Sequence, residues 1–433
     1  MTPKPDTATT LSASTTDSAE VDVEKTISDW VEDNWDPDMT LGTWWERLAE
    51  SGYAHPALPE SAGGKGWNRA QAARAMRRLG ELGVVGPPPG LGHMLAAPTI
   101  ADHGTPEQIE KFIPPILTGR VAWCQLFSEP AAGSDLAGLQ TKAERDGDEW
   151  IFTGQKVWTS QGHYADYGML VARTDPEQPK HRGMSYFALP MDQAGVDVRP
   201  LKEMTGRTFF SEVFMERAKA TTSDLIGAQG DGWRVANTTL GYERSSIGEG
   251  SAGFVLAAPG SRANNFDRKV GQIVEAARNR KVGGHAPGVG MKLFKRYREL
   301  AVKLGRTEDP LMRAEIIELY TLLWINRLNQ QRARVKNQRT GGEPNIAKLY
   351  DAEIHRRFRD VSLRIVQADG MLAGASSSTD PSIAELALHA CAPAIYGGTD
   401  QIQRNILGER VLGLPKEPGP SKDVPFHELP KNQ

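Results

Sequence analysis

Cysteine is scarce in this sequence, because Cys124 and Cys391 are the two present among 433 residues. Two cysteines cannot build a disulfide scaffold, and the chain has no Cys-x-x-Cys or Cys/His cluster of the kind that binds zinc. It also lacks any run of about 18 uninterrupted apolar residues, and residues 1–20 lack the apolar core of a secretion signal. These absences predict a cytoplasmic protein that does not enter a membrane.

An excess of charge of either sign is missing too. The chain carries 51 Lys plus Arg against 54 Asp plus Glu, for a formal net charge of -3. Without a broad basic field, we expect no binding to nucleic acid or to anionic lipid. The phosphate-binding P-loop, the zinc-peptidase His-Glu-x-x-His and the hydrolase Gly-x-Ser-x-Gly do not occur, which excludes three common classes of hydrolytic enzyme.

The chain is long enough for about three units of roughly 150 residues. Apolar residues recur three or four positions apart up to about residue 117, which is typical of helices. Short alternating apolar runs then predict strands, and helical spacing returns after Gly232. We therefore expect a multidomain α+β protein, divided into a disordered tail (1–22), an N-terminal helical domain (23–120), a middle β domain (121–229), a C-terminal helical bundle (230–414) and a Pro-rich tail without packed structure (415–433).

Three motifs lie along this chain. The first, Gln125-Leu-Phe-Ser-Glu-Pro-Ala-Ala-Gly-Ser-Asp-Leu-Ala-Gly138, contains a turn rich in backbone donors that suits a polar cofactor edge. The second, Gly154-Gln-Lys-Val-Trp-Thr-Ser160, places a large aromatic ring beside two hydroxyl groups. The third is Ile395-Tyr-Gly-Gly-Thr-Asp-Gln-Ile-Gln-Arg404. An isolated Trp158 would be interpreted as a core residue, but the surrounding motif favours a ligand contact.

Together these motifs resemble the acyl-CoA dehydrogenases, and the likeness runs in order from about Leu41 to Leu414. The resemblance implies an N-terminal helical domain, a middle antiparallel β-barrel-like domain and a C-terminal four-helix bundle, with FAD between the β domain and the bundle. It implies FAD contacts at Gln125, Leu126, Phe127, Ser128, Gly133, Ser134, Trp158, Thr159, Ser160, Arg280, Gln367, Gly370, Thr399 and Gln401. It implies substrate contacts at Ser134, Arg244, Tyr396 and Gly397.

The reaction that this resemblance implies is α,β-desaturation of an acyl-CoA thioester, in which a carboxylate removes the α-proton and the β-hydrogen leaves as hydride to the flavin. Much of the family carries this carboxylate in a Tyr-Glu-Gly-Thr segment, but here the corresponding position is Gly397. Leu240, Glu243 and Ile247 share one helical face, so Glu243 lies on an apolar stripe where burial should raise its pKa. A second family pattern has its base at the Glu of such a Glu-Arg pair. We predict Glu243 as the base; a helix salt bridge is its alternative interpretation.

Gly397 can still offer a backbone N–H to the thioester carbonyl. Two other segments depart from the family pattern, since Gly283 and Met371 replace a usual Phe and a usual Gly. The departures resemble bacterial members with branched, bulky or steroid-derived substrates, some of which assemble two different subunits into a heterotetramer.

We therefore expect an oligomeric FAD enzyme, a homodimer, homotetramer or heterotetramer, that passes electrons to an electron-transfer flavoprotein. The alternatives are a non-catalytic or co-catalytic subunit that completes a partner's FAD site, and a flavin-dependent oxidase or monooxygenase of the same fold. No metal is expected.

Overall fold

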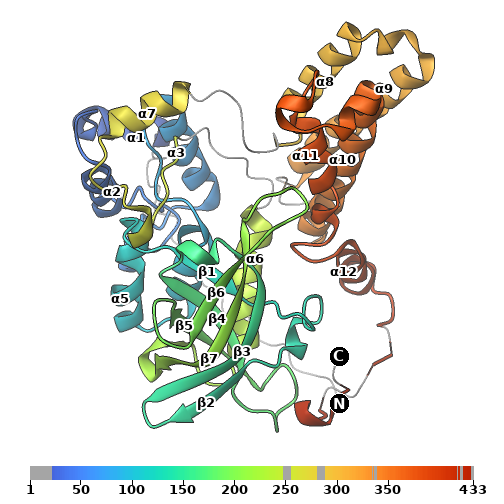
Figure 1. The fold of residues 1–433 in the computed structure, drawn as a ribbon. Helices are drawn as coiled ribbons and strands as arrows, with labels where there is room; N and C mark the ends of the chain where they lie inside the picture. Colours follow the sequence, from blue (N-terminus) through green and yellow to red (C-terminus); the bar gives the residue numbers. More distant parts are fainter. Residues whose placement is uncertain are drawn as a thin grey trace, which may run out of the picture.

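The computed structural model describes residues 22–246, 255–279, 288–333, 335, 339–416, 418–419 and 423–430. Figure 1 shows a group of N-terminal helices next to a twisted sheet, with a helical bundle standing to one side of both. The N-terminal helices are α1 (Val23–Asn34), α2 (Leu41–Glu50), α3 (Arg69–Leu82), α4 (Ala97–His103) and α5 (Pro106–Leu117). A π-helical turn, η2 (Gly92–Ala96), precedes α4.

Local sequence explains the starts of two of these helices and the anchoring of a third. Asn68 begins α3 with a capping box, and Thr105 does the same for α5. In α2, Trp44 and Trp45 are fully buried and donate their indole N–H groups to the carbonyls of Val85 (2.7 Å) and Gly86 (3.0 Å). Since both buried N–H groups have hydrogen-bond partners, the two rings add apolar contact to the core without leaving a buried donor unsatisfied.

The middle of the chain forms one sheet, with strand order β6-β7-β3-β2-β4-β5-β8 and β1 beside β4. Its strands are β1 (Trp123–Leu126), β2 (Lys142–Asp146), β3 (Glu149–Ser160), β4 (Tyr167–Arg173), β5 (Met184–Pro190), β6 (Val196–Leu201), β7 (Phe210–Thr221) and β8 (Leu225–Ile226). The pairing is antiparallel except that β1 and one residue of β2 run parallel to β4. The parallel pairing of β1 with β4 is possible because the whole β2–β3 hairpin separates them in the chain.

The two faces of the sheet belong to different cores. In β4, Met169 and Val171 pack with the N-terminal helices, whereas Leu170 and Ala172 point to a second core on the opposite face. This alternation follows from the two-residue period of a strand, and burial on both faces explains the nearly continuous apolar run of β4.

The helices after Gly232 separate into two groups. The first, α6 (Gly232–Ser246) and α7 (Val270–Asn279), adds Val235, Ala236, Ile273 and Val274 to the N-terminal core. The bundle contains α8 (Met291–Lys303), α9 (Pro310–Arg332), α10 (Glu343–Val366) and α11 (Ser382–His389), which share a core of their own. The sequence predicted a C-terminal helical bundle over residues 230–414. Within that range, the helices that share the bundle core begin at α8.

Two contacts link the bundle and the chain that follows it to the sheet domain. Arg207, on the turn between β6 and β7, forms an ion pair with Glu385 of α11. After α12 (Asp400–Ile406) the chain returns to the sheet, where Pro425 pairs with Pro179. The expectation that the tail lacks packed structure is therefore wrong for this part of it. Within the described residues, none of the helices combines the length and apolarity that crossing a bilayer requires.

Candidate active site

Glu243 begins the last turn of α6, the helix that crosses the face of the sheet shared with the N-terminal helices. The Gln125 side chain, from β1, donates from Nε2 to Glu243 Oε2 at 3.4 Å. Burial raises the pKa of the Glu243 carboxyl, while Gln125 and the neighbouring Arg244 oppose the rise. A carboxylate with a raised pKa, to which an amide donates, is suited to accept a proton.

Arg244 follows Glu243 on α6 and is half-buried. Burial lowers the pKa of Arg244, the Glu243 charge raises it, and Arg410 of the C-terminal segment lowers it. Because the charge of Arg410 acts on Arg244, the chain after α12 lies near the end of α6. Ile247, the third residue of the predicted apolar stripe, lies outside the described residues.

A buried polar network supports the helix one turn before Glu243. Thr239 Oγ1 lies 3.0 Å from Thr99 Oγ1 on α4 and donates to the Tyr186 hydroxyl of β5 at 3.3 Å. All three side chains are buried. They connect α6 to a helix and to a strand, so they restrict rotation of α6 and hence of the Glu243 side chain.

The first two sequence motifs meet through the main chain. Val157 N–H donates to the Ser128 carbonyl at 2.9 Å, so the segment after β1 runs beside the end of β3. Beneath this contact, Lys156 Nζ donates to Glu129 Oε1 at 2.8 Å and to the Phe127 carbonyl at 3.0 Å. Glu129 also accepts from the backbone N–H groups of Gln140 (2.6 Å) and Thr141 (2.9 Å).

Lys156 and Glu129 are both buried, and sequence reasoning missed them as residues that position the site. Burial would raise the pKa of Glu129, but Lys156, Thr141 and Gln140 outweigh it and lower the pKa. The pair thus holds Phe127 and Glu129 in place. The sequence did contain a signal for this pair. Each of the two motifs carries one charged residue at a position whose side chain faces the core, and the two are of opposite sign.

Trp158 occupies an irregular position in β3. The pairing of β3 with β7 shifts register between Lys156 and Thr159, and Trp158 has φ +60°. This bulge turns the indole outward, where the side chain is 60% exposed and meets the Phe210 ring edge-on at 5.8 Å. A non-glycine residue in the left-handed region costs about 1–2 kcal/mol. An exposed, strained tryptophan at a bulge indicates a binding surface.

The remaining residues of these motifs divide by orientation. Leu126 and Phe127 are buried in the two cores, and the Thr159 side chain is buried as well, so their side chains face away from the surface. Gly133 and Ser134 lie exposed on the turn after β1, and Ser128 and Ser160 are half-buried. Of this set, the side chains of Ser128, Ser134 and Ser160 remain able to meet a ligand, and Leu126, Phe127 and Thr159 can contribute only their backbone.

The third motif forms a glycine turn at the base of the bundle. Gly397 (φ +63°) and Gly398 (φ +84°) both adopt left-handed conformations, and Thr399 caps α12 by accepting from Ile402 N–H at 3.2 Å. Gln403 is buried and donates to the Gly397 carbonyl at 2.8 Å. Sequence reasoning missed Gln403. By contrast, the predicted contact Gln401 is exposed.

The α10 end of the bundle carries the other predicted cofactor residues. Gln367 ends α10 with φ +54°, and its side chain accepts from Arg306 Nη2 at 2.8 Å. Gly370 packs so closely that an added Cβ would lie 2.8 Å from Leu363 Cδ2. Arg280 lies outside the described residues, as does Gly283. Tyr396 is exposed in part, and burial of the rest raises the pKa of its phenol to about 12.

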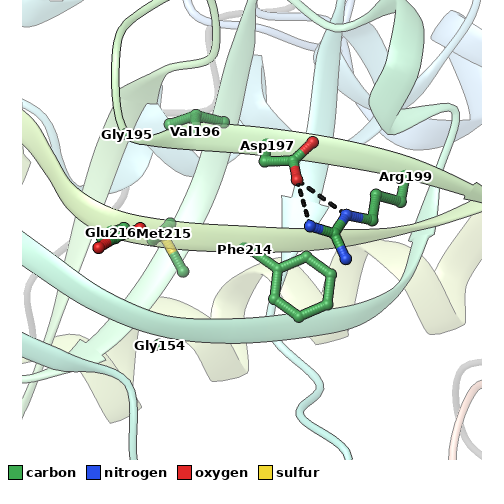
Figure 2. A pocket seen from close by; sticks show the side chains of 8 residues that line it. All are labelled: Gly154, Gly195, Val196, Asp197, Arg199, Phe214, Met215 and Glu216. Atoms are coloured by element: carbon green, nitrogen blue, oxygen red, sulfur yellow. Dashed lines mark hydrogen bonds and ion pairs between the residues drawn. The ribbon is translucent and has the colours of Figure 1, made fainter.

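A hollow of about 460 Å³ on the sheet is separate from the predicted site residues. It is lined along β6, β7 and β3, where Asp197 and Arg199 form an ion pair at 2.7 Å and the Arg199 guanidinium lies over the Phe214 ring (Figure 2). None of the predicted site residues lines it. An exposed ion pair within one strand is a surface feature, so the hollow is not assigned to the active site.

The residues present fit a flavin at the meeting point of the first two motifs. The outward Trp158 offers an apolar plane for a flat ring system, and the half-buried Ser128 and Ser160 hydroxyls offer polar contacts beside it. Among the described residues there is no cluster of His, Cys, Asp and Glu able to hold a metal ion. The arrangement therefore provides a proton acceptor, Glu243, and a surface for an aromatic cofactor.

Three family models match the chain in succession. They are the acyl-CoA dehydrogenase N-terminal domain over residues 5–120, the middle domain over 124–218 and the C-terminal domain over 230–412. The chain is 34% identical to acyl-CoA dehydrogenase IpdE1 of Mycobacterium tuberculosis over 382 residues, which cover 86% of this chain and 88% of the relative.

Two solved structures share the fold. The first is the Tcur3481-Tcur3483 steroid ACAD (24% identity, TM-score 0.68, 91% of this chain and 96% of the other), and the second is the ChsE4-ChsE5 complex of Mycobacterium tuberculosis (21% identity, TM-score 0.66, the same coverage).

Proposed function

The chain belongs to the acyl-CoA dehydrogenase family, and on that premise we propose that it is an FAD-dependent enzyme that desaturates the α,β-bond of an acyl-CoA thioester. The observation that carries the proposal is the position of Glu243, a carboxylate whose pKa is raised by burial and which Gln125 holds at 3.4 Å. The family assignment and the α+β fold predicted from the sequence are confirmed; the flavin, the base and the acyl group belong to the proposal.

Glu243 removes the α-proton of the thioester in this proposal. Its pKa is raised because burial disfavours the charged carboxylate, which makes the ionised form a stronger base once the substrate has excluded water. FAD, when bound, supplies the acceptor for the β-hydrogen, which leaves as hydride. Gln125 orients the carboxylate, and the lack of a carboxylate at Gly397 leaves Glu243 as the base.

The thioester carbonyl needs a donor when negative charge develops on its oxygen. The left-handed Gly397 turn, braced by Gln403, offers backbone N–H groups at the base of the bundle. We assign this role to the Gly397 N–H, with Arg244 and Tyr396 beside the acyl group and Ser134 contacting both flavin and CoA. We assign the cofactor contacts to the first two motifs, 125–138 and 154–160. Their exposed and half-buried residues contribute side chains, and their buried residues contribute backbone atoms. The other cofactor contacts are assigned to Arg280, Gln367, Gly370, Thr399 and Gln401.

We propose a branched, bulky or steroid-derived acyl group. Support comes from the names of similar proteins, since a structure with the same fold is described as a steroid ACAD. Two features of this chain agree: the base lies on α6 instead of the glycine turn, and the turn itself carries no side chain at Gly397 or Gly398 to occupy space. An electron-transfer flavoprotein is the proposed electron acceptor.

The decisive experiment uses the purified protein under anaerobic conditions with a panel of acyl-CoA thioesters, from short linear to steroid-derived. A flavin spectrum that bleaches with a bulky thioester supports the proposal. Glu243→Gln should retain the flavin and lose the bleaching, because the amide cannot accept the proton. Glu275→Gln, which changes an exposed carboxylate on α7, is the matched control and should bleach normally. Bleaching that is unchanged in Glu243→Gln would rule out the base assignment.

A second candidate is a subunit that shares its FAD site with a different chain. It is favoured by the ChsE4-ChsE5 complex, a two-protein assembly of the same fold, and by the exposed apolar side chains along α9, among them Leu311, Ile317 and Leu328. Protein that purifies without flavin and gains it with a partner chain would favour this candidate. Reoxidation of the bleached flavin by oxygen with turnover would instead indicate an oxidase or monooxygenase.

A further inference from the structure

The segment 423–430 lies beyond the last residue matched by the family models, yet it is packed against the sheet domain. We call it the C-terminal strap. Phe426 N–H donates to the Gln178 carbonyl at 3.0 Å and His427 N–H to the Pro176 carbonyl at 3.2 Å. The strap thereby pairs with the loop that joins β4 to β5. In Figure 1 the dark red turn of the strap lies beside the lower part of the sheet.

Phe426 covers a buried cation. The Arg173 guanidinium, at the end of β4, lies 3.7 Å from the centre of the Phe426 ring. Arg173 is 4% exposed, and burial lowers its pKa to about 10, against the raising effect of Glu129 and Asp135. Its Nε has no hydrogen-bond partner among the described residues. The aromatic face therefore adds to the compensation of this charge.

Arg173 joins the strap to the turn that carries Ser134. Its Nη2 donates to the carbonyls of Ala137 (2.6 Å) and Leu139 (3.2 Å), just after that turn. Its Nη1 donates to the Lys180 carbonyl at 2.6 Å. The Lys180 side chain in turn donates to Asp135 at 2.8 Å. The residue that follows Ser134 is thus held from the same loop to which the strap is paired.

We propose that the C-terminal strap positions the Gly133–Asp135 turn through Phe426 and Arg173, and so sets the affinity of the turn for the flavin and CoA moieties. Phe426 and Arg173 are positioning residues, since neither contacts the ligand. This inference rests on the proposed function for the identity of the ligand, but the coupling between strap and turn can be measured without any ligand.

The test compares full-length variants by amide hydrogen exchange. It monitors the backbone N–H groups of Gly138 and Leu139, which donate to the carbonyls of Asp135 (2.8 Å) and Leu136 (3.1 Å) and so close the helical turn that follows Gly133–Asp135. Phe426→Leu keeps apolar bulk and removes the aromatic face, and Phe426→Trp keeps that face. Glu428→Gln, an exposed change inside the strap, is the matched control. The same proteins, stripped of flavin, are titrated with FAD, and their melting temperatures are recorded.

We expect Phe426→Leu to raise the exchange rate of Gly138 and Leu139 and the Kd for FAD about threefold to tenfold, the range of a cation–π contact. Phe426→Trp and Glu428→Gln should match the unaltered protein in both measurements. Equal exchange at Gly138 and Leu139 in Phe426→Leu would overturn the proposal. So would faster exchange spread evenly over the whole chain, because it would mean a general loss of stability. A chain that never binds FAD would contradict the proposed function but leave the exchange result standing.

Discussion

Gln125 of β1 and Glu243 of α6 meet at 3.4 Å, although 118 positions separate them in the chain. One belongs to the motif after the N-terminal helices, and the other belongs to the helix that follows the sheet. Their contact brings the proposed base to the strand that leads into the flavin motif. Burial keeps the pKa of Glu243 raised, although the Gln125 amide and the Arg244 charge both lower it.

Glu243→Gln is expected to stabilise the protein at neutral pH. The folded-state pKa of Glu243 lies above its ordinary value of 4.5, so its contribution to stability is complete below that value and is lost as pH rises through the folded pKa. Removing the buried charge should therefore raise the melting temperature at pH 7 to 8.

The difference in melting temperature should shrink as the pH is lowered, because the native carboxyl then takes up its proton. Scanning calorimetry at a series of pH values from 8 downward tests the sign. A variant that is less stable than the parent at pH 8 would show that Glu243 has a stabilising ion pair there. In the same pH range, kcat/KM of the unaltered enzyme should rise as Glu243 ionises, because the base acts in its deprotonated form.

Lys156→Met is expected to lower the free energy of unfolding by about 3–5 kcal/mol, because it leaves the buried Glu129 carboxylate without its cation. Lys219→Met removes an exposed partner of Glu149 from the same sheet and should cost less than about 1 kcal/mol. Urea unfolding of both variants gives the comparison. Similar losses in the two would mean that the Lys156 pair is effectively solvated.

At position 158 we expect glycine to be more stable than alanine, the reverse of the usual order in a strand. At φ +60° an alanine is strained, so Trp158→Gly should be more stable than Trp158→Ala by about 1 kcal/mol. Both variants lack the ring, and both should bind FAD more weakly than the parent. Thermal melts and flavin titrations check the two effects separately. An alanine variant as stable as the glycine variant would argue against the bulge at Lys156–Thr159 in solution.

Gln403→Met is expected to raise KM for the acyl-CoA and to lower stability by about 1–3 kcal/mol, since it leaves buried groups without partners. The lost bonds are to the Gly397 carbonyl (2.8 Å) and from Asn345 Nδ2 (2.6 Å). Arg404→Met changes the exposed neighbour on α12 and should leave KM unaltered. Lower stability with an unchanged KM would restrict Gln403 to a structural role.

The sequence by itself predicted the family, the order of helices, strands and helices, and the carboxylate at Glu243. Those predictions depend on motifs and periodicities that are local in the chain, such as the Gly397–Gly398 turn and the apolar face shared by Leu240 and Glu243. It could not predict that α7 packs with the N-terminal helices, because an amphipathic helix does not specify which apolar surface it covers.

Orientation within the motifs was equally beyond sequence reasoning. Leu126, Phe127 and Thr159 belong to the flavin motifs, yet their side chains are buried. The two-residue period of a strand assigns alternate side chains to opposite faces. A bulge such as the one at Trp158 interrupts this alternation, so the residues after it point to the opposite face from the one that the period predicts.

The residues proposed for the chemistry can therefore be predicted from local motifs. The contacts that hold these residues in place join parts of the chain that are distant in sequence. Gln125 with Glu243, Lys156 with Glu129 and Phe426 with Arg173 are separated by 118, 27 and 253 positions. Such partners are chosen by burial, since a charge removed from water is stable only next to the dipole, ion or aromatic ring that the whole fold places beside it.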